Sequence, residues 1–259
     1  MTNPQILTAH FTDANHDLNV QIENNIENWD ELSMTIDGIK FYSDYIDGFG
    51  WWRVEGEQAE EACSKFHMVE YDLSYIETGG NRMVREFALQ CYAMDIKIPI
   101  TLIHSDSQTD KEGVLEFAFQ HIPYDGRSKT TFVCDGKSFH VDDIICTKFS
   151  VSVDDETFAA DNPSIDFEKS LLNICKAIKG KYLLKCCFGC KYADYGANIR
   201  CFEQVGARYE QIESKVSFFN ILADAKKTGI NIPAVCETWL CEKFRPRIGG
   251  KGGYRGNIY

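Results

Sequence analysis

The first 160 residues alternate apolar and polar side chains in short runs, and few folds accommodate that pattern. Among the clearest runs are "LSMTIDGIKFYSDYI", "HMVEYDLSYI", "MDIKIPITLIH", "GVLEFAFQHI" and "ICTKFSVSV". A period of two residues puts one face of a strand in the core and the other in solvent. Asp37-Gly38 and Asp135-Gly136 interrupt two runs with a dipeptide that favours a tight hairpin turn. We therefore predict about eight short strands without intervening helices, arranged as an antiparallel sandwich or barrel.

The pattern changes to a helical period in the remainder of the chain. Residues 162–180 and 213–229 each place apolar side chains at helical spacing and end in a glycine, Gly180 and Gly229. Glycine is the usual residue just beyond a helix C-terminus. The predicted fold class is α+β, with an antiparallel, sandwich-like domain over 1–160 and a smaller α+β module over 161–259.

Charge divides the chain at the same place. Residues 1–160 hold 11 Lys+Arg and 29 Asp+Glu, a net charge of −18, whereas residues 161–259 hold 16 and 10, a net charge of +6. An acidic surface attracts basic partners and repels nucleic acid, although it also serves simple solubility. The chain has no apolar run of about 18 residues and its first residues do not resemble an export signal, so we expect a cytosolic protein without a membrane segment.

The chain has eleven cysteines, six of which crowd into residues 186–241, while the other five are scattered along the sequence. Their odd number and the missing export signal favour reduced thiols and metal ligands over disulfides. Cys187 and Cys190 form a CxxC pair, whose spacing lets two thiolates reach one ion. Cys201 and Cys241 are candidates for the other two ligands. Cys186 could replace Cys187, and Cys236 could replace Cys241.

All six histidines precede this region, so the expected metal shell consists of cysteine alone. Four thiolates in a tetrahedral arrangement suit Zn²⁺ and leave no open position for a reacting water, which predicts a structural zinc site. Two other interpretations remain, a redox-active dithiol and ordinary buried cysteines.

Several motifs are spread over residues 184–256: "CCFGCKYADY", "IRCFEQ", "CETWLCEKFRPR" and "GYRG". These motifs resemble those of an uncharacterised bacterial protein family of unknown function. The chain departs from the family pattern at Ala193, where the family has serine, and in a shorter loop after Tyr195. The resemblance implies that the recurring ligands are Cys187, Cys190, Cys201 and Cys241, in preference to Cys186 and Cys236. It implies a shared metal-centred module and supplies no activity.

Other polar clusters carry weaker signals. His104, His121 and His140 stand near carboxylates or serines, but no nucleophile motif frames them. Asp194, Tyr192 and Tyr195 follow the CxxC pair and are expected to orient the groups around a metal. Adjacent tryptophans at 51 and 52 must face opposite sides of a strand, so one belongs to the core and the other can serve a protein interface. The basic tail is expected to pair with the acidic β-rich part through Arg245, Arg247, Lys251 and Arg255.

These observations favour a binding protein over an enzyme. The leading hypothesis is a protein whose acidic surface engages a basic protein partner, in the manner of an immunity or inhibitor protein that neutralises a basic toxin; that role rests on analogy. The first alternative is a hydrolytic enzyme with a His/carboxylate site in the β-rich part. The second is a nucleic-acid-binding module in the basic C-terminal region, which predicts that an isolated 161–259 fragment binds heparin or RNA.

Overall fold

A computed structural model describes most of the chain. It covers residues 5–25, 31–43, 52–54, 56–77, 80–122, 131–134, 137–140, 143–164, 166–195, 199–205, 215–230, 232, 235, 237–238 and 242–247. Side chains are described at all of these positions except 25, 31, 71–77, 80–86, 122, 131–134, 137–140, 143, 195 and 215–219.

The chain folds into two compact units that interleave in sequence. Unit 1 comprises residues 1–97, 117–148 and 163–166, and unit 2 comprises 98–116, 149–162 and 167–259. The long strands β8 (Ala93–His104), β9 (Asp110–Ile122) and β12 (Asp143–Val153) each contribute one part to each unit. The expected division into domains 1–160 and 161–259 stays a prediction.

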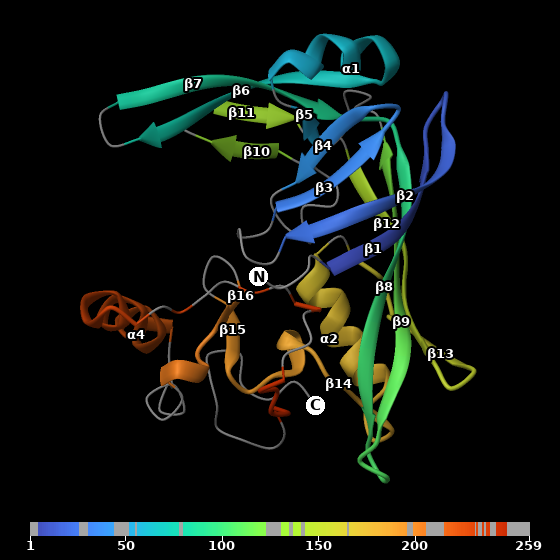
Figure 1. Cartoon of the computed structure of the whole chain (residues 1–259), viewed down its shortest axis with the longest axis vertical. Helices are drawn as coiled ribbons and strands as arrows, with labels where there is room; N and C mark the ends of the chain where they lie inside the picture. Colours follow the sequence, from blue (N-terminus) through green and yellow to red (C-terminus); the bar gives the residue numbers. More distant parts are fainter. Residues whose placement is uncertain are drawn as a thin grey trace. The chain divides into compact units, whose positions relative to one another are not determined.

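Unit 1 is built on an antiparallel sheet with the strand order β8-β1-β2-β3-β4-β5-β7-β6 (Figure 1). The strands are β1 (Gln5–Thr12), β2 (Asp17–Asn25), β3 (Glu31–Ile36), β4 (Ile39–Ser43), β5 (Arg53–Val54), β6 (Met68–Glu77) and β7 (Gly80–Leu89). A separate hairpin pairs β10 (Thr131–Cys134) with β11 (Lys137–His140). The short helix α1 (Ala59–Lys65) follows a 3₁₀ turn, η2 (Gly56–Gln58).

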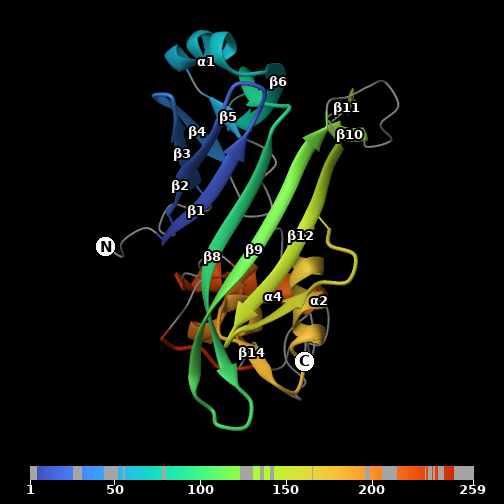
Figure 2. The same ribbon diagram turned by 90° about the vertical axis from the view of Figure 1, so that its right-hand side faces the viewer.

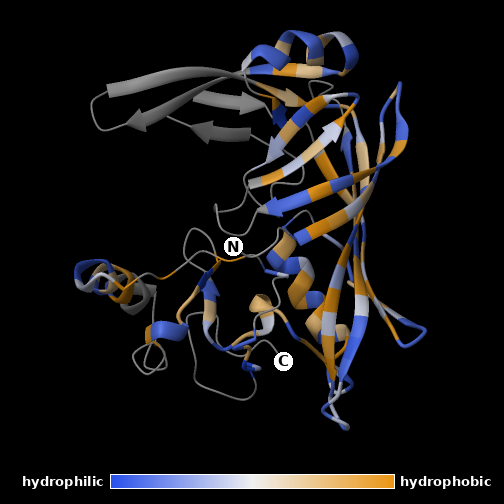
Figure 3. Ribbon diagram, in the orientation of Figure 1, coloured by the Kyte–Doolittle hydropathy of each residue, from blue (hydrophilic) through white to orange (hydrophobic). Residues whose placement is uncertain are grey.

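The alternating sequence of β1 and β2 explains how the sheet forms a core. Leu7, Ala9 and Phe11 on β1 are at most 4% exposed, and the intervening side chains face outward. Hydrophobic and hydrophilic residues accordingly alternate along these strands in Figure 3. Trp52 is fully buried in the same unit, which confirms a core role for one of the paired tryptophans; Trp51 lies outside the described residues.

The predicted turn at Asp37-Gly38 is confirmed. It joins β3 to β4 with Ile36 paired to Ile39, and both turn residues have positive φ, 50° and 80°. Such angles belong to a two-residue hairpin turn that glycine and aspartate tolerate best. The second such dipeptide, at 135–136, lies outside the part of the chain that the structure describes.

Unit 2 combines a small sheet with helices. Its strands follow the order β13-β12-β9-β8-β14, with β13 (Glu156–Ala159) and β14 (Tyr182–Leu184) at the two ends. Figure 2 shows β8, β9 and β12 side by side. Helix α2 (Phe167–Ala177) begins with Phe167, whose ring packs against Phe149 of β12 with the ring centroids 5.3 Å apart. A hairpin of β15 (Ala193–Tyr195) and β16 (Ile199–Cys201), the turn η4 (Glu203–Val205) and helix α4 (Lys215–Thr228) complete the unit.

Both predicted helices are confirmed as α2 and α4, and the glycines after them adopt positive φ, 86° at Gly180 and 73° at Gly229. The expectation that no helix interrupts the strands is wrong, because α1 lies between β5 and β6. The α+β class holds, and the sandwich arrangement stays a prediction. Within the described ranges, no helix is both long and apolar enough to cross a bilayer.

Candidate functional site

The CxxC segment folds as a tight, buried turn after β14. This turn is the 3₁₀ segment η3 (Cys187–Gly189), which lies close after the end of β14. The Gly189 N–H donates to the Cys186 carbonyl at 3.0 Å, and the Cys190 N–H donates to the Cys187 carbonyl at 3.1 Å. Cys187 and Cys190 are only 4% and 6% exposed. We call this segment, residues 186–190, the knuckle.

The β15–β16 hairpin brings Cys201 to the same region. The strand register pairs Ala193 with Cys201. Ile199 and Cys201 share one face of β16 because side chains alternate along a strand. Ile199 packs with Cys187 and Cys190 in one hydrophobic cluster. Cys201, which is half-buried, therefore lies on the strand face that is turned toward the two knuckle cysteines.

A segment distant in sequence, residues 244–247, closes over the knuckle. The Lys191 N–H donates to the Arg245 carbonyl at 2.8 Å, and the Arg247 N–H donates to the Gly189 carbonyl at 3.0 Å. Cys190 and Pro246 form an antiparallel bridge between these hydrogen bonds. The chain thus adds a short strand-like edge to the knuckle.

The stretch before that edge also contacts the knuckle region. The Phe188 N–H donates to the Glu237 carbonyl at 2.9 Å, and the Val235 N–H donates to the Ile199 carbonyl at 3.0 Å. Cys236 and Cys241 lie outside the described residues. The segments that flank Cys241 in sequence, at 237 and at 244–247, are both hydrogen-bonded to the knuckle or the residue beside it.

Arg247 is the charged centre of this arrangement. Its guanidinium donates to the carbonyl oxygens of Cys190 and Lys191, at 3.3 Å each, and to that of Ala193. Its Nη1 lies 4.0 Å from the Asp194 carboxylate, and the two side chains are 2% and 0% exposed. A buried arginine needs such an acceptor set, since an unpaired charge is costly to bury. These contacts lie within unit 2, whereas we expected Arg247 to pair with the acidic β-rich part. Lys251 and Arg255 lie outside the described residues.

The structure leaves the zinc site a prediction. Among the residues that it describes, no three His, Cys, Asp or Glu side chains are grouped closely enough to hold a metal ion. Three of the four predicted ligands, Cys187, Cys190 and Cys201, belong to one local fold. The donor set fits Zn²⁺ chemically, because thiolates are its preferred ligands in closed structural sites.

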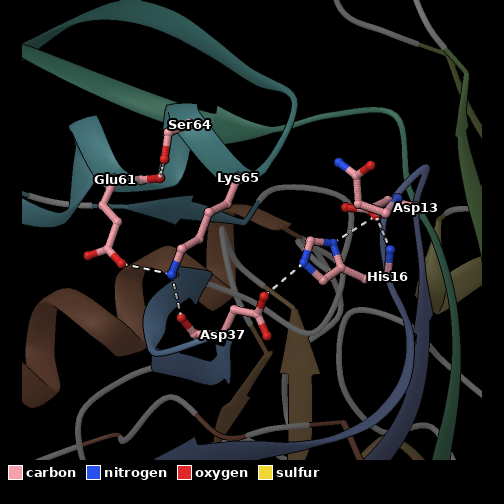
Figure 4. A network of polar contacts seen from close by, with 7 residues as sticks. Asp13, His16, Asp37, Glu61, Ser64 and Lys65 are labelled. Atoms are coloured by element: carbon pink, nitrogen blue, oxygen red, sulfur yellow. Dashed lines mark hydrogen bonds and ion pairs between the residues drawn. The ribbon is translucent and has the colours of Figure 1, made fainter.

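Unit 1 contains a polar network that the sequence analysis missed (Figure 4). His16, in the loop between β1 and β2, holds the Asp13 carboxylate with Nδ1 at 2.8 Å and the Asp37 carboxylate with Nε2 at 3.1 Å. Its ring stacks on Phe66 with centroids 4.6 Å apart. Lys65 donates to the Asp37 carbonyl at 2.9 Å, which ties α1 to the same turn. Asp13 and His16 form a local turn signal, but the contact with Asp37 depends on sheet register.

The two carboxylates favour the charged form of His16. Burial alone would lower its pKa, but the hydrogen bonds and negative charges of Asp13 and Asp37 outweigh that effect and raise the pKa above its ordinary value. An imidazolium with both N–H groups donated to carboxylates has no lone pair to accept a proton. In its charged form, His16 is therefore a structural cation in this arrangement rather than a general base.

The histidines of the hydrolase alternative have structural contacts. His104 Nδ1 accepts from the Ser107 N–H at 3.4 Å, and its ring meets Tyr182 edge-on at 5.3 Å. His121 is 1% exposed and stacks on Tyr92 at 5.1 Å. The side chain of His140 lies outside the described set. The enzyme alternative stays a prediction.

Tyr182 anchors a charged cluster near His104. Its hydroxyl donates to the Asp154 carboxylate at 3.1 Å, and Lys111 lies 3.0 Å from the same carboxylate. The hydrogen bond from Lys111 is the main cause that lowers the pKa of Asp154. Because the Asp154 carboxylate is paired with Lys111, the cluster stabilises the β12–β13 turn through an ion pair.

Fold and site define an α+β protein that is mainly antiparallel sheet and carries a buried cysteine knuckle. The chain belongs to DUF6304, a family of unknown function, whose model matches residues 5–193. The match ends within the segment that follows the knuckle, so the cysteine signature over 184–256 lies mostly beyond it. No curated protein and no solved structure matched the chain.

Proposed function

We propose that the protein is a non-enzymatic binding protein whose unit 1 engages a basic protein partner. The observation that carries the proposal is the division of charge between the units. Unit 1 contains 10 Lys+Arg and 23 Asp+Glu, a net charge of −13, whereas unit 2 contains 17 and 16, a net charge of +1. The acidic character belongs almost wholly to one compact unit.

Charge concentrated in this way has a physical consequence. A surface with one dominant sign speeds association with an oppositely charged partner and suppresses encounters with nucleic acid. Salt screens such attraction over about 8 Å at physiological ionic strength, so binding must weaken as salt rises. An inhibitor or immunity protein that neutralises a basic toxin is the specific role that this behaviour fits.

In the same proposal, unit 2 is stabilised by a structural Zn²⁺ held by Cys187, Cys190, Cys201 and Cys241. Three facts support it: the first two thiols lie in one buried turn, Cys201 shares a strand face with Ile199 of the same cluster, and both flanks of Cys241 are hydrogen-bonded at the knuckle. A closed four-thiolate shell stabilises the fold and leaves no position for substrate.

Two matched charge variants test the binding proposal. The unit 1 variant carries Asp17→Asn, Glu57→Gln and Glu60→Gln, and the unit 2 variant carries Asp106→Asn, Glu112→Gln and Asp155→Asn; all six side chains are exposed. The full-length wild type should capture basic proteins from a lysate at about 50 mM salt and release them by about 300 mM. The unit 1 variant should capture less, and the unit 2 variant should match the wild type. Capture of basic proteins that does not change with salt concentration, or an equal loss of capture in both variants, would refute the proposal.

The zinc proposal is tested by metal analysis of protein purified without added zinc. One zinc per chain is expected, with loss in Cys187→Ser and Cys241→Ser and retention in the exposed-cysteine control Cys63→Ser. A metal-free wild type would instead favour the redox interpretation of the CxxC pair.

A further inference from the structure

The outer face of strands β2, β1 and β8 in unit 1 carries a hollow with a largely polar lining. The hollow has a volume of about 710 Å³. Its polar lining consists of Thr8, His10, Asn19, Gln21, Asp95 and Lys97. We call this hollow the strand platform.

Sheet register explains why these side chains gather. His10 pairs with Asn19 on one side and with Asp95 on the other, so the three lie in one row across the sheet. The next row consists of Gln21, Thr8 and Lys97. Alternation puts both rows on the solvent face of the three strands.

A fully buried opposite face keeps the platform rigid. Leu7, Phe11, Ile22 and Ile96, which alternate with the platform residues, are all 0% exposed. Packed strands hold backbone positions closely, and the short side chains of Thr8, Asn19 and Asp95 lose little rotamer entropy when a ligand arrives. The platform is therefore preorganised for binding in a way that an exposed loop is not.

Among the described residues, one acceptor of the platform is both shielded from solvent and without a donor. His10 is engaged with Asn19 Oδ1 at 3.2 Å and with the Asp17 carboxylate at 3.0 Å. Asp95 Oδ1 is shielded from solvent and has no hydrogen-bond donor within the described part of the chain. A shielded carboxylate oxygen without a donor is unfavourable, and a cationic donor is the group that relieves it best.

We propose that the strand platform receives an arginine or lysine side chain of the basic partner, with Asp95 as its carboxylate acceptor. This inference rests on the proposed function and names the place where it acts. The net charge of −13 on unit 1 favours a cation, and Asn19 and Gln21 add acceptor oxygens around the hollow. The volume lies within the range of specific binding pockets, about 300–1,000 Å³.

The test compares two substitutions that remove the same charge from unit 1. Asp95→Asn neutralises the platform, and Glu60→Gln neutralises an exposed position on α1. The probe is a fluorescein-labelled hexa-arginine peptide, with binding followed by fluorescence anisotropy at low salt. Asp95→Asn should weaken binding about three- to tenfold, and Glu60→Gln less than about twofold. Equal effects would overturn the platform while leaving an acidic binding unit in place, whereas a wild type that does not bind the peptide would overturn the proposed function itself.

A second measurement needs no variant. In nuclear magnetic resonance spectra of the wild type, the side-chain amide signals of Asn19 and Gln21 should shift on addition of hexa-arginine. The side-chain amide of Asn24 is the internal control, because this residue is 2% exposed and its amide donates to Gln5 at 3.3 Å. Shifts confined to other exposed residues would overturn the inference.

Discussion

Replacing His16 with phenylalanine should destabilise unit 1 and abolish a specific pH dependence. The imidazole of His16 stacks on Phe66 with ring centroids 4.6 Å apart, and a phenylalanine at position 16 keeps a ring in that place. The substitution removes both ion-pair hydrogen bonds. The bond to Asp13 joins side chains that are only 10% and 8% exposed, so it is worth about 1.5–3 kcal/mol. The bond to Asp37, which is 55% exposed, adds about 0.2–1 kcal/mol.

Asp13 keeps other donors in the variant. The N–H groups of residues 15 and 16 donate to its carboxylate at 2.8 and 2.7 Å, so the charge is not left unpaired. The expected decrease in the free energy of unfolding near pH 6 is therefore about 2 kcal/mol, toward the lower end of the sum of the two contributions.

The sign of the pH dependence follows from the direction of the pKa shift. His16 has a raised pKa in the folded protein, against an ordinary value of 6.5. Its ion pairs contribute their full stability below that ordinary value, and the contribution is lost as pH rises through the higher, folded-state pKa. The free energy of unfolding of the wild type should therefore fall across this pH window. The His16→Phe variant lacks the ion pairs, so its free energy of unfolding should not show that fall.

Urea unfolding followed by tryptophan fluorescence measures the effect, since Trp52 is fully buried in the same unit. Curves at about pH 5.5 and about pH 8.5 bracket the titration. His67→Phe is the matched control, because this histidine is exposed. If His16→Phe retained the pH dependence of the wild type, or if His67→Phe removed it, the assignment of the ion pairs as the source would be refuted.

Three further predictions concern unit 2. Gly113→Ala should cost about 1–3 kcal/mol in urea unfolding, because its Cβ would lie 2.6 Å from Leu102 Cδ1 and 2.9 Å from the backbone oxygen of Ser152. Arg247→Met should cost about 3–5 kcal/mol by leaving Asp194 buried without its cation, and the double variant with Asp194→Asn should recover part of that loss; no recovery would contradict the pairing. A strong zinc chelator should lower the melting temperature of the wild type by calorimetry, and an unchanged temperature would count against a structural metal.

The local features of the fold could be predicted from the sequence. The alternation of β8 and β12, the helical spacing of α2 and α4 and the turn at Asp37-Gly38 all depend on neighbours within a few residues. Strands β1, β2, β7 and β13 fall outside the predicted runs. Strand β1 alternates well, but Asn, Asp and His residues surround it. Helix α1 has only seven residues, too few to show a helical period.

Contacts that depend on register could not be predicted. His16 meets Asp37 across 21 positions of sequence, and β14 pairs with β8 through Leu183 and Ile103. The cysteine spacing predicted that Cys187 and Cys190 share a turn, and the structure shows that turn. The role of Arg247 could not be read from charge alone, because its acceptors are mostly backbone carbonyls, which every residue offers.

The contacts of residues 244–247 with the knuckle cannot form until the ribosome has synthesised that segment. Arg247 and the Cys190 carbonyl that it binds are 57 positions apart. At about 5–20 residues per second, a ribosome needs roughly 3–11 s to add that stretch. Until that stretch has been added, the knuckle thiols of the nascent chain lack the cover that residues 244–247 provide.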